Sequence, residues 1–345
     1  MTLRKEGAKT SLVPDPSANV KNSPNGILGV NAILISVKDL DVALAFYQAA
    51  TPFELIKREQ IQNDAASDRL FCTTGAEMKR AVLRAPNMLL ELLEFSENRD
   101  RATSKMPIQG PGMTHTCYQT PAEQSGYQAF RSAGAGILTS GESPVDLGGY
   151  GVTYAYAHDP HGNMLEMEQL DQPVLEHTGY YQSPVLKNQA MWITQVCLVS
   201  PDIERLLAFY AEVLGISPSR RVEVKNNAKA AAIGGVESLH ILGAWFQLDE
   251  HSKVLELWQY LDPKTPAERL DRTPSTLGYS FAIEVNDVLA ELQRIQAIEG
   301  LHLFGEPVEF DDFIGVYGCD IDGNVFCLRQ MLDPASPHSV RALDQ

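Results

Sequence analysis

The segment DPHGNMLEMEQ (Asp159–Gln169) decides the fold of this chain, because a close variant, DIDGNVFCLRQ (Asp320–Gln330), occurs near its end. Each segment begins with a cluster of Asp, Gly and Asn that is typical of a turn, and the run after it is typical of a short strand. When the two segments are aligned, Cys327 and Arg329 stand where the first copy has Glu166 and Glu168. Because strand side chains alternate between two faces, these two positions lie on the same face of the strand. We therefore predict a duplicated scaffold with a single metal site, to which Glu166 belongs.

Length, charge and cysteine content narrow the class of protein. The chain has 345 residues, enough for two ordinary domains, and its formal net charge is −16 without a Lys/Arg-rich block. That balance argues against nucleic acid or an anionic membrane as a partner. Five cysteines without CxxC spacing argue against a disulfide framework or a thiolate zinc site. No apolar run approaches the roughly 20 residues of a membrane span, and the first residues lack the apolar centre of a signal peptide, so we expect a cytoplasmic protein.

Recurring phrases divide the chain into four units. KDLDVALAFY at Lys38 recurs as PDIERLLAFY at Pro201, and MLLELLEF at Met88 recurs as KVLELWQY at Lys253. Each unit is predicted to contain a strand, an amphipathic helix and about three further strands, which is an internal repeat of a βαβββ module in an α+β fold. The predicted organisation is a flexible arm (1–27), a first domain of two modules (28–172), a linker (173–190), a second domain of two modules (191–333) and a tail (334–345).

These phrases resemble the vicinal-oxygen-chelate superfamily, which includes glyoxalase I, methylmalonyl-CoA epimerase, extradiol dioxygenases and bleomycin- or fosfomycin-resistance proteins. The resemblance covers roughly residues 28–332 and depends on the strand–DL–x–FY opening, the LEL strand and the DPxGNxxE close of the modules. It implies that the four modules pair into two cup-shaped mixed sheets. It does not imply one reaction, because this superfamily includes lyases, isomerases, dioxygenases and non-catalytic binders.

The resemblance also implies two ligand positions in each module, one on the first strand and one on the last. Transferred by motif register, the positions in modules one to four are Ala32 and Glu91, His115 and Glu166, Gln195 and Glu256, and Ser280 and Cys327. Pairing module two with module three gives a Gln/Glu/His/Glu set that resembles the metal ligands of animal glyoxalase I. Pairing module one with module four gives a poor metal site. Pairing within each domain would instead combine Ala32 and Glu91 with His115 and Glu166; we favour pairing across the domains.

Each of these candidate residues also has an interpretation in which its role is purely structural. A lone histidine such as His115 on a strand is usually structural, and only the matching position of Glu166 favours a ligand. Glu91 and Glu256 lie between leucines, where a carboxylate needs a partner or a metal unless the strand face meets solvent. Other polar and aromatic residues are predicted to lie in turns (His158 and His161) or in the core or a cavity wall (Trp245 and Trp258), and four arginines are candidate anion binders (Arg80, Arg84, Arg220 and Arg221).

The leading functional hypothesis is a metal-dependent, glyoxalase-like lyase or isomerase. One imidazole and several oxygen ligands suit Zn, or Fe, Mn, Co or Ni. The substrate would be a small molecule with vicinal oxygens, and Glu166 or Glu256 would remove a carbon-bound proton to give an enediolate-type intermediate. The alternatives are an extradiol-type dioxygenase, which lacks its second histidine here, and a resistance-type protein that binds a small molecule without turnover. The expected assembly is a monomer or homodimer.

Overall fold

The computed structural model describes residues 25–62, 64–177 and 182–344, which form four modules, each opening on a strand followed by an outer helix. The first module contains β1 (Ile27–Val37), α1 (Leu40–Ala50), β2 (Glu54–Ile61), α2 (Ala65–Phe71), β3 (Met78–Arg84) and β4 (Leu89–Phe95). The second contains β5 (Gly112–His115), β6 (Cys117–Pro121), α3 (Gly126–Ser132), β7 (Gly136–Ile137), β8 (Val145–Asp146), β9 (Val152–His158) and β10 (Met164–Leu170).

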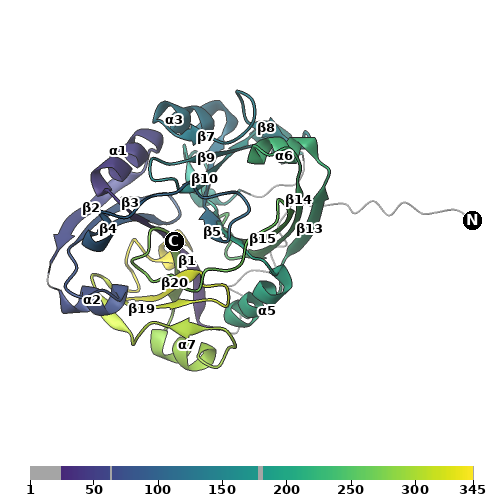
Figure 1. The fold of residues 1–345 in the computed structure, drawn as a ribbon. Helices are drawn as coiled ribbons and strands as arrows, with labels where there is room; N and C mark the ends of the chain where they lie inside the picture. Colours follow the sequence, from purple (N-terminus) through teal and green to yellow (C-terminus); the bar gives the residue numbers. More distant parts are fainter. Residues whose placement is uncertain (1–24, 63, 178–181, 345) are drawn as a thin grey trace, which may run out of the picture.

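The second half of the chain repeats this order after a short helix, α4 (Gln172–Glu176). The third module contains β11 (Trp192–Ile193), β12 (Gln195–Val199), α5 (Ile203–Leu214), β13 (Arg220–Lys225), α6 (Ala228–Gly234), β14 (His240–Gln247) and β15 (Val254–Asp262). The fourth contains β16 (Gly278–Val285), α7 (Val288–Ile295), β17 (His302–Leu303), β18 (Val308–Phe310), β19 (Phe313–Cys319) and β20 (Val325–Met331). Helices α1 and α3 lie together on one side of the molecule, and α5 and α7 lie on the opposite side (Figure 1).

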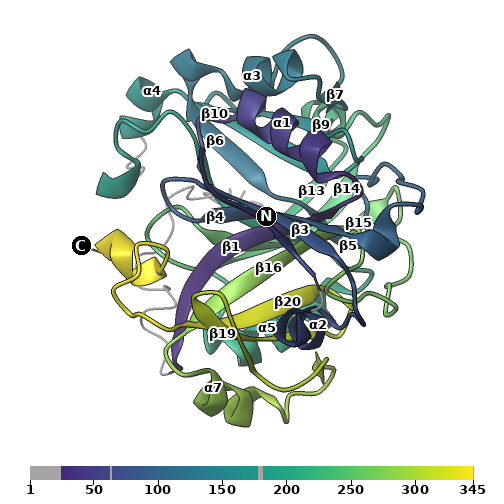
Figure 2. The same cartoon turned by 90° about the vertical axis from the view of Figure 1, so that its left-hand side faces the viewer.

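The modules pair across the two halves, as favoured from the sequence. Strand β1 pairs antiparallel with β16 (Figure 2), which joins modules one and four into a nine-stranded sheet of order β17-β19-β20-β16-β1-β4-β3-β2, with β18 added at β19. Modules two and three meet through β5 with β12 and β6 with β11. Below we call the first sheet the 1/4 cup and the second arrangement the 2/3 cup.

The 2/3 cup differs from the prediction in one respect. Its two central strands are each interrupted, at Thr116 and at Thr194, so the cup consists of a six-stranded sheet (β11-β6-β10-β9-β7, with β8 on β9) and a five-stranded sheet (β13-β14-β15-β12-β5). The Thr116 hydroxyl donates to the Gln195 carbonyl at 2.6 Å, and the Thr194 amide donates to the Cys117 carbonyl at 3.0 Å. The first strand of module two is therefore divided into β5 and β6, and the bend between them lies beside His115.

The repeated sequence phrases have structural causes. The aspartate of the "DL" phrase caps its helix: the side chain of Asp39 accepts from the amides of Asp41 and Val42, and Asp202 and Asp287 cap α5 and α7 in the same way. Such a cap typically contributes about 1 kcal/mol. The sequence did not predict the two short helices α2 and α6, which follow β2 and β13.

The "FY" and "DxxGN" phrases form one hydrogen-bonded unit. Tyr47 of α1 donates its hydroxyl to Asp159 at 3.1 Å, and Tyr210 of α5 donates to Asp320 at 2.8 Å. Each aspartate also accepts from the asparagine four residues later, with Asn163 donating to Asp159 at 2.9 Å. These recurrences therefore connect the outer helix of one module to the turn of the next within each half, and they belong to the scaffold.

The predicted boundaries of the arm, the linker and the tail can be compared with the described residues. Strand β1 begins at Ile27, one residue before the predicted start of the first domain, and residues 1–24 of the predicted arm lie outside the described residues, as do 178–181 of the linker. Within the tail, the amide of Val340 donates to the buried carboxylate of Glu284 at 2.7 Å. Among the described residues, no helix combines the length and apolar character needed to cross a bilayer.

Candidate metal centre

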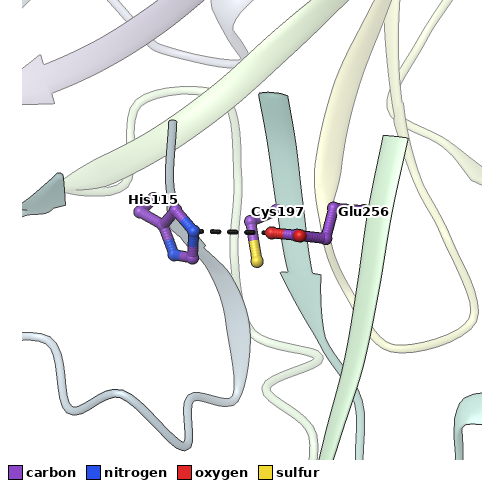
Figure 3. Close-up of side chains that lie close together, drawn as sticks. All are labelled: His115, Cys197 and Glu256. Atoms are coloured by element: carbon purple, nitrogen blue, oxygen red, sulfur yellow. Dashed lines mark ion pairs between the residues drawn. The ribbon is translucent and has the colours of Figure 1, made fainter. Parts of the chain in front are cut away.

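Four strands of the 2/3 cup bring the predicted ligands together. His115 is the last residue of β5, Glu166 lies in β10, Gln195 begins β12 and Glu256 lies in β15. His115 Nε2 lies 3.4 Å from Glu166 Oε2 and 3.6 Å from Glu256 Oε2. Figure 3 shows His115 and Glu256 pointing toward each other, with Cys197 beside them. The register transferred from the sequence therefore placed all four side chains around one point.

Two polar groups in this cluster lack an ordinary partner. His115 is buried, its Nδ1 lies 3.0 Å from the Thr114 hydroxyl, and its Nε2 has no hydrogen-bond partner among the described residues. The amide of Gln195 directs one terminal atom at Glu166 Oε2 (2.7 Å) and Glu256 Oε2 (3.2 Å). As nitrogen, that atom would donate to both carboxylates; as oxygen, it would need a cation between them. A buried imidazole nitrogen and an amide facing two carboxylates are the environment that a divalent cation would satisfy.

Four of the six distances among these ligand atoms also fit one shared ion. Atoms bound about 2.1 Å from a metal are about 3.0 to 3.4 Å apart when they are neighbours in octahedral or tetrahedral coordination. The distances of 2.7, 3.2, 3.4 and 3.6 Å bracket that range. The set of one imidazole, two carboxylates and one amide oxygen suits Zn and the neighbouring first-row divalent metals. The residues present therefore fit a divalent metal.

The two carboxylates differ in their electrostatics. Burial, together with the charge of Glu256, raises the pKa of Glu166 above its ordinary value. Burial alone would also raise the pKa of Glu256, but the charge of the nearby His115 imidazole outweighs it and lowers that pKa. Glu256 Oε1 accepts from the indole N–H of Trp245 at 2.8 Å. Glu256 is thus the anchored carboxylate, and Glu166 is the one whose proton is held more tightly.

Sequence reasoning gave no ligand role to three members of this neighbourhood. Cys197 lies opposite both His115 and Glu256 in the sheet register, and these three side chains have ligand atoms within 4.8 Å of one another. A second such group contains Cys117, Glu166 and Glu168. The signal for Cys197 was present, because Gln195 and Cys197 share a face of one strand. Burial raises the pKa of Cys197 to about 12, so its thiol stays protonated without a metal.

A cavity of about 580 Å³ opens above these carboxylates. Its size is within the range of small-molecule sites. Glu166, Gln195 and Glu256 are exposed to it, and its aromatic walls contain Tyr150, Tyr154, Tyr156, Trp245, Trp258 and Tyr260. Burial raises the pKa of Tyr156 and Tyr260 well above the ordinary value, which keeps their phenols neutral. Trp245 and Trp258 therefore form cavity wall, as predicted.

The remaining predicted ligand positions lie in the 1/4 cup and hold no such cluster. Ala32, Ser280 and Cys327 offer no acidic or imidazole ligand, and Glu91 is paired with two guanidinium groups: Arg80 donates its Nε to Glu91 at 3.0 Å, and Arg329 donates an Nη to the other oxygen. His158 and His161 serve the turn region, as predicted, since His158 Nε2 lies 2.7 Å from the Met106 carbonyl and His161 Nδ1 accepts from the Lys38 amide at 3.2 Å.

The chain belongs to the glyoxalase/bleomycin resistance protein/dioxygenase superfamily. One family model of that superfamily matches residues 29–167, and a second matches residues 194–311. Both halves of the chain are thus matched, which confirms the family resemblance and the α+β fold of repeated modules.

Particular relatives give the range of proteins that the chain is similar to. A curated relative, the ethylmalonyl-CoA/methylmalonyl-CoA epimerase of Cereibacter sphaeroides, is 27% identical over 142 residues, which are 41% of this chain and 97% of the epimerase. Glyoxalase I from Zea mays has a similar structure, with a TM-score of 0.59 at 20% identity over 90% of this chain and 94% of that one. A putative dioxygenase from Bacillus subtilis has a TM-score of 0.56 at 13% identity over 93% and 91%. These structural likenesses concern the fold.

Proposed function

We propose that this protein is a metal-dependent lyase or isomerase of the glyoxalase type, acting on a small substrate with two neighbouring oxygens. The observation that supports it most directly is the meeting of His115, Glu166, Gln195 and Glu256, of which the last three line an open aromatic cavity. In this proposal those four residues hold the ion. A divalent ion there would draw electron density from the substrate oxygens and stabilise the negative charge that develops when the adjacent carbon loses its proton.

The residues themselves divide the remaining work. Glu166 acts as the base, because its raised pKa reduces the gap to a carbon acid, and each unit of pKa is worth about 1.4 kcal/mol. Glu256 keeps its position through Trp245 and takes the second proton-transfer role if the proton returns to the other face of the carbon. The aromatic walls exclude water from the reacting carbon. The base and its counterpart are thus on strands of the two different sheets of the 2/3 cup, β10 and β15.

The alternative activities make different demands on this site. An extradiol-type dioxygenase would need a second histidine, whereas His115 is the one imidazole among these four residues. Oxygen consumption with catechols after anaerobic loading with Fe(II) would favour it. A non-catalytic binder would need the same cavity and no base, so it differs from the proposal in turnover alone.

Metal content and carbon–hydrogen exchange test the proposal. We expect about one divalent ion per chain by elemental analysis, and a rise in the free energy of unfolding of about 2.7 kcal/mol when the metal is added to the metal-free protein at 100 times its Kd. Both effects should be lost in His115→Ala and kept in Glu309→Gln, an exposed carboxylate in the 1/4 cup. With hydroxyketones or hemithioacetals in D2O, NMR should show deuterium entering the carbon next to the vicinal oxygens.

Glu166→Gln tests the role of Glu166 as the base. This variant should lose carbon–hydrogen exchange by a factor of about 100 or more, because the amide is not a base. The proposal is wrong if the purified protein takes up no stoichiometric metal and Glu166→Gln exchanges every oxygenated substrate at the wild-type rate. A metal-loaded protein that binds such compounds without exchange would instead be a binder.

A further inference from the structure

The four arginines that the sequence marked as candidate anion binders have different fates. Three of them have acidic partners, in the pairs Arg80 with Glu91, Glu59 and Asp311, Arg84 with Glu54, and Arg221 with Glu204. The side chain of Arg220 makes no hydrogen bond or ion pair with any described residue, and its Nε is buried without a partner. In a chain with 44 acidic and 28 basic residues, a cation without an acidic partner is unexpected.

Arg220 lies in the wall of the cavity above the candidate metal centre. It begins β13 opposite Trp245, and its guanidinium carbon lies 4.6 Å from the centre of the Trp245 ring. Such stacking holds the guanidinium plane while its N–H groups stay available. The same indole donates to Glu256 Oε1 at 2.8 Å. Trp245 thus contacts both Arg220 and Glu256, so a small molecule in the cavity can reach the guanidinium and the carboxylates at the same time.

The rest of the wall indicates what kind of molecule would lie between them. Tyr150 and Tyr154 line the cavity on the other half of the cup, and Trp258 packs edge-on to Trp245 at 5.1 Å between ring centres. Burial raises the pKa of Tyr150, and the positive charge of Arg220 opposes that shift, so the phenol is within electrostatic reach of the guanidinium. Flat ring walls favour a flat apolar body. A planar guanidinium with free N–H groups favours a carboxylate.

We infer that the substrate of this site is a carboxylate with a flat body, whose vicinal oxygens face Glu166 and Glu256 while its carboxylate is bound by Arg220. This inference rests on the proposed function and adds the substrate class to it. A single guanidinium balances a single negative charge, so the observations favour a carboxylate over a phosphate dianion, which would call for further cations.

A matched pair of probes tests this inference. 3,4-Dihydroxybenzoate has two adjacent oxygens, a flat ring and a carboxylate on the far side, and 3,4-dihydroxybenzamide differs from it by lacking the charge. With the metal-loaded wild-type protein, isothermal titration calorimetry should give a Kd at least about tenfold lower for the acid than for the amide. Arg220→Gln should remove that preference and leave the affinity for the amide within about twofold. Arg220→Lys should keep part of it, since it retains charge without the planar fork.

Arg221→Gln is the control, because it removes the same charge from the next residue, which also lines the cavity but whose exposed guanidinium is already paired with Glu204. It should retain the full preference for the acid. The inference is overturned if the wild type binds both probes equally, fails to bind the acid, or keeps its preference in Arg220→Gln. If the protein holds no metal but still prefers the acid through Arg220, the proposed function fails and this inference stands. A metal-loaded protein that does not distinguish the probes contradicts this inference alone.

Discussion

The two cups are built from the same module, but the buried carboxylate of the LEL strand has different partners in each. Glu91 and Glu256 occupy matching positions of the LEL strands, and both are buried, at 1% and 4% exposed. Glu256 faces an imidazole without a partner on Nε2, next to an open cavity. Glu91 faces the guanidinium groups of Arg80 and Arg329. In the 2/3 cup, the negative charge of Glu256 is therefore available to a cation from solution. In the 1/4 cup, two arginines of the chain neutralise the charge of Glu91.

The helix that follows the second strand of the module differs in the same sense. In the 1/4 cup, α2 ends in Phe71, which packs edge-on against Phe95 and Phe310 at 5.4 and 5.5 Å between ring centres. In the 2/3 cup, α6 has the same length and ends in Gly234, which lines the cavity. A large aromatic side chain at the end of one helix joins the core of that cup, whereas the other helix ends in a glycine whose missing side chain lets Ile108, another cavity-wall residue, pack against it.

This comparison teaches that the cup shape alone does not make a site. A buried carboxylate needs a positive partner in either cup. Where an arginine of the same chain is that partner, the carboxylate has a structural role. The other ligand positions then need no metal ligand, as Ala32, Ser280 and Cys327 illustrate. Where no such partner is supplied, the same position requires a cation from solution.

Removing Glu91 should have the largest effect on stability. Glu91→Gln leaves Arg329, which is 2% exposed and already has two nitrogens without partners, as an uncompensated buried charge. We expect the free energy of unfolding to fall by about 3–5 kcal/mol, measured by urea denaturation monitored by circular dichroism.

In the metal-free protein, Glu166→Gln should be neutral or stabilising, because the folded state already disfavours the charged form of that group.

A double variant distinguishes charge from packing. Glu91→Leu with Arg329→Met replaces the pair by apolar groups, and it should recover most of the loss seen with Glu91→Gln. Equal destabilisation by the double variant and by Glu91→Gln would mean that shape, and not the unpaired cation, is what the 1/4 cup requires.

Acid should weaken the 1/4 cup through the same group. Burial alone would raise the pKa of Glu91, but the charges of Arg329 and Arg80 outweigh it and lower the pKa to about 2 from an ordinary value of 4.5. Because the folded pKa is the lower one, this contribution to stability is present above pH 4.5 and is lost as the pH falls toward 2. It amounts to about 3 kcal/mol, and Glu91→Gln should lack it. Denaturation curves of both proteins between pH 6 and pH 2 would reveal an unchanged difference if this assignment is wrong.

How much the sequence predicted follows from the range of each interaction. The module repeat and the face of each strand were predictable because turn residues and alternation are local, and the register then placed His115, Glu166, Gln195 and Glu256. The sequence also marked Arg329 as unlike its counterpart. It did not give the partner of Arg329, because Glu91 lies 238 residues away and reaches it only through the pairing of β1 with β16. The unpaired state of Arg220 likewise became visible only when the partners of the other arginines were known.

The smallest predicted effect concerns the indole that anchors Glu256. Trp245→Phe keeps the ring wall and removes the N–H that donates to Glu256 Oε1. Groups that orient a metal ligand typically contribute 10–100-fold to metal affinity, and we expect a loss near tenfold because Glu256 keeps His115 and Gln195 beside it. Trp258→Phe is the matched comparison: Trp258 lines the same cavity and helps to lower the pKa of Glu256, but its indole N–H has no hydrogen-bond partner among the described residues, so competitive metal titration should show a smaller change. Equal losses in the two variants would mean that the rings act by excluding water, and that Glu256, like Glu91, is positioned by packing and charge without the help of a neutral donor.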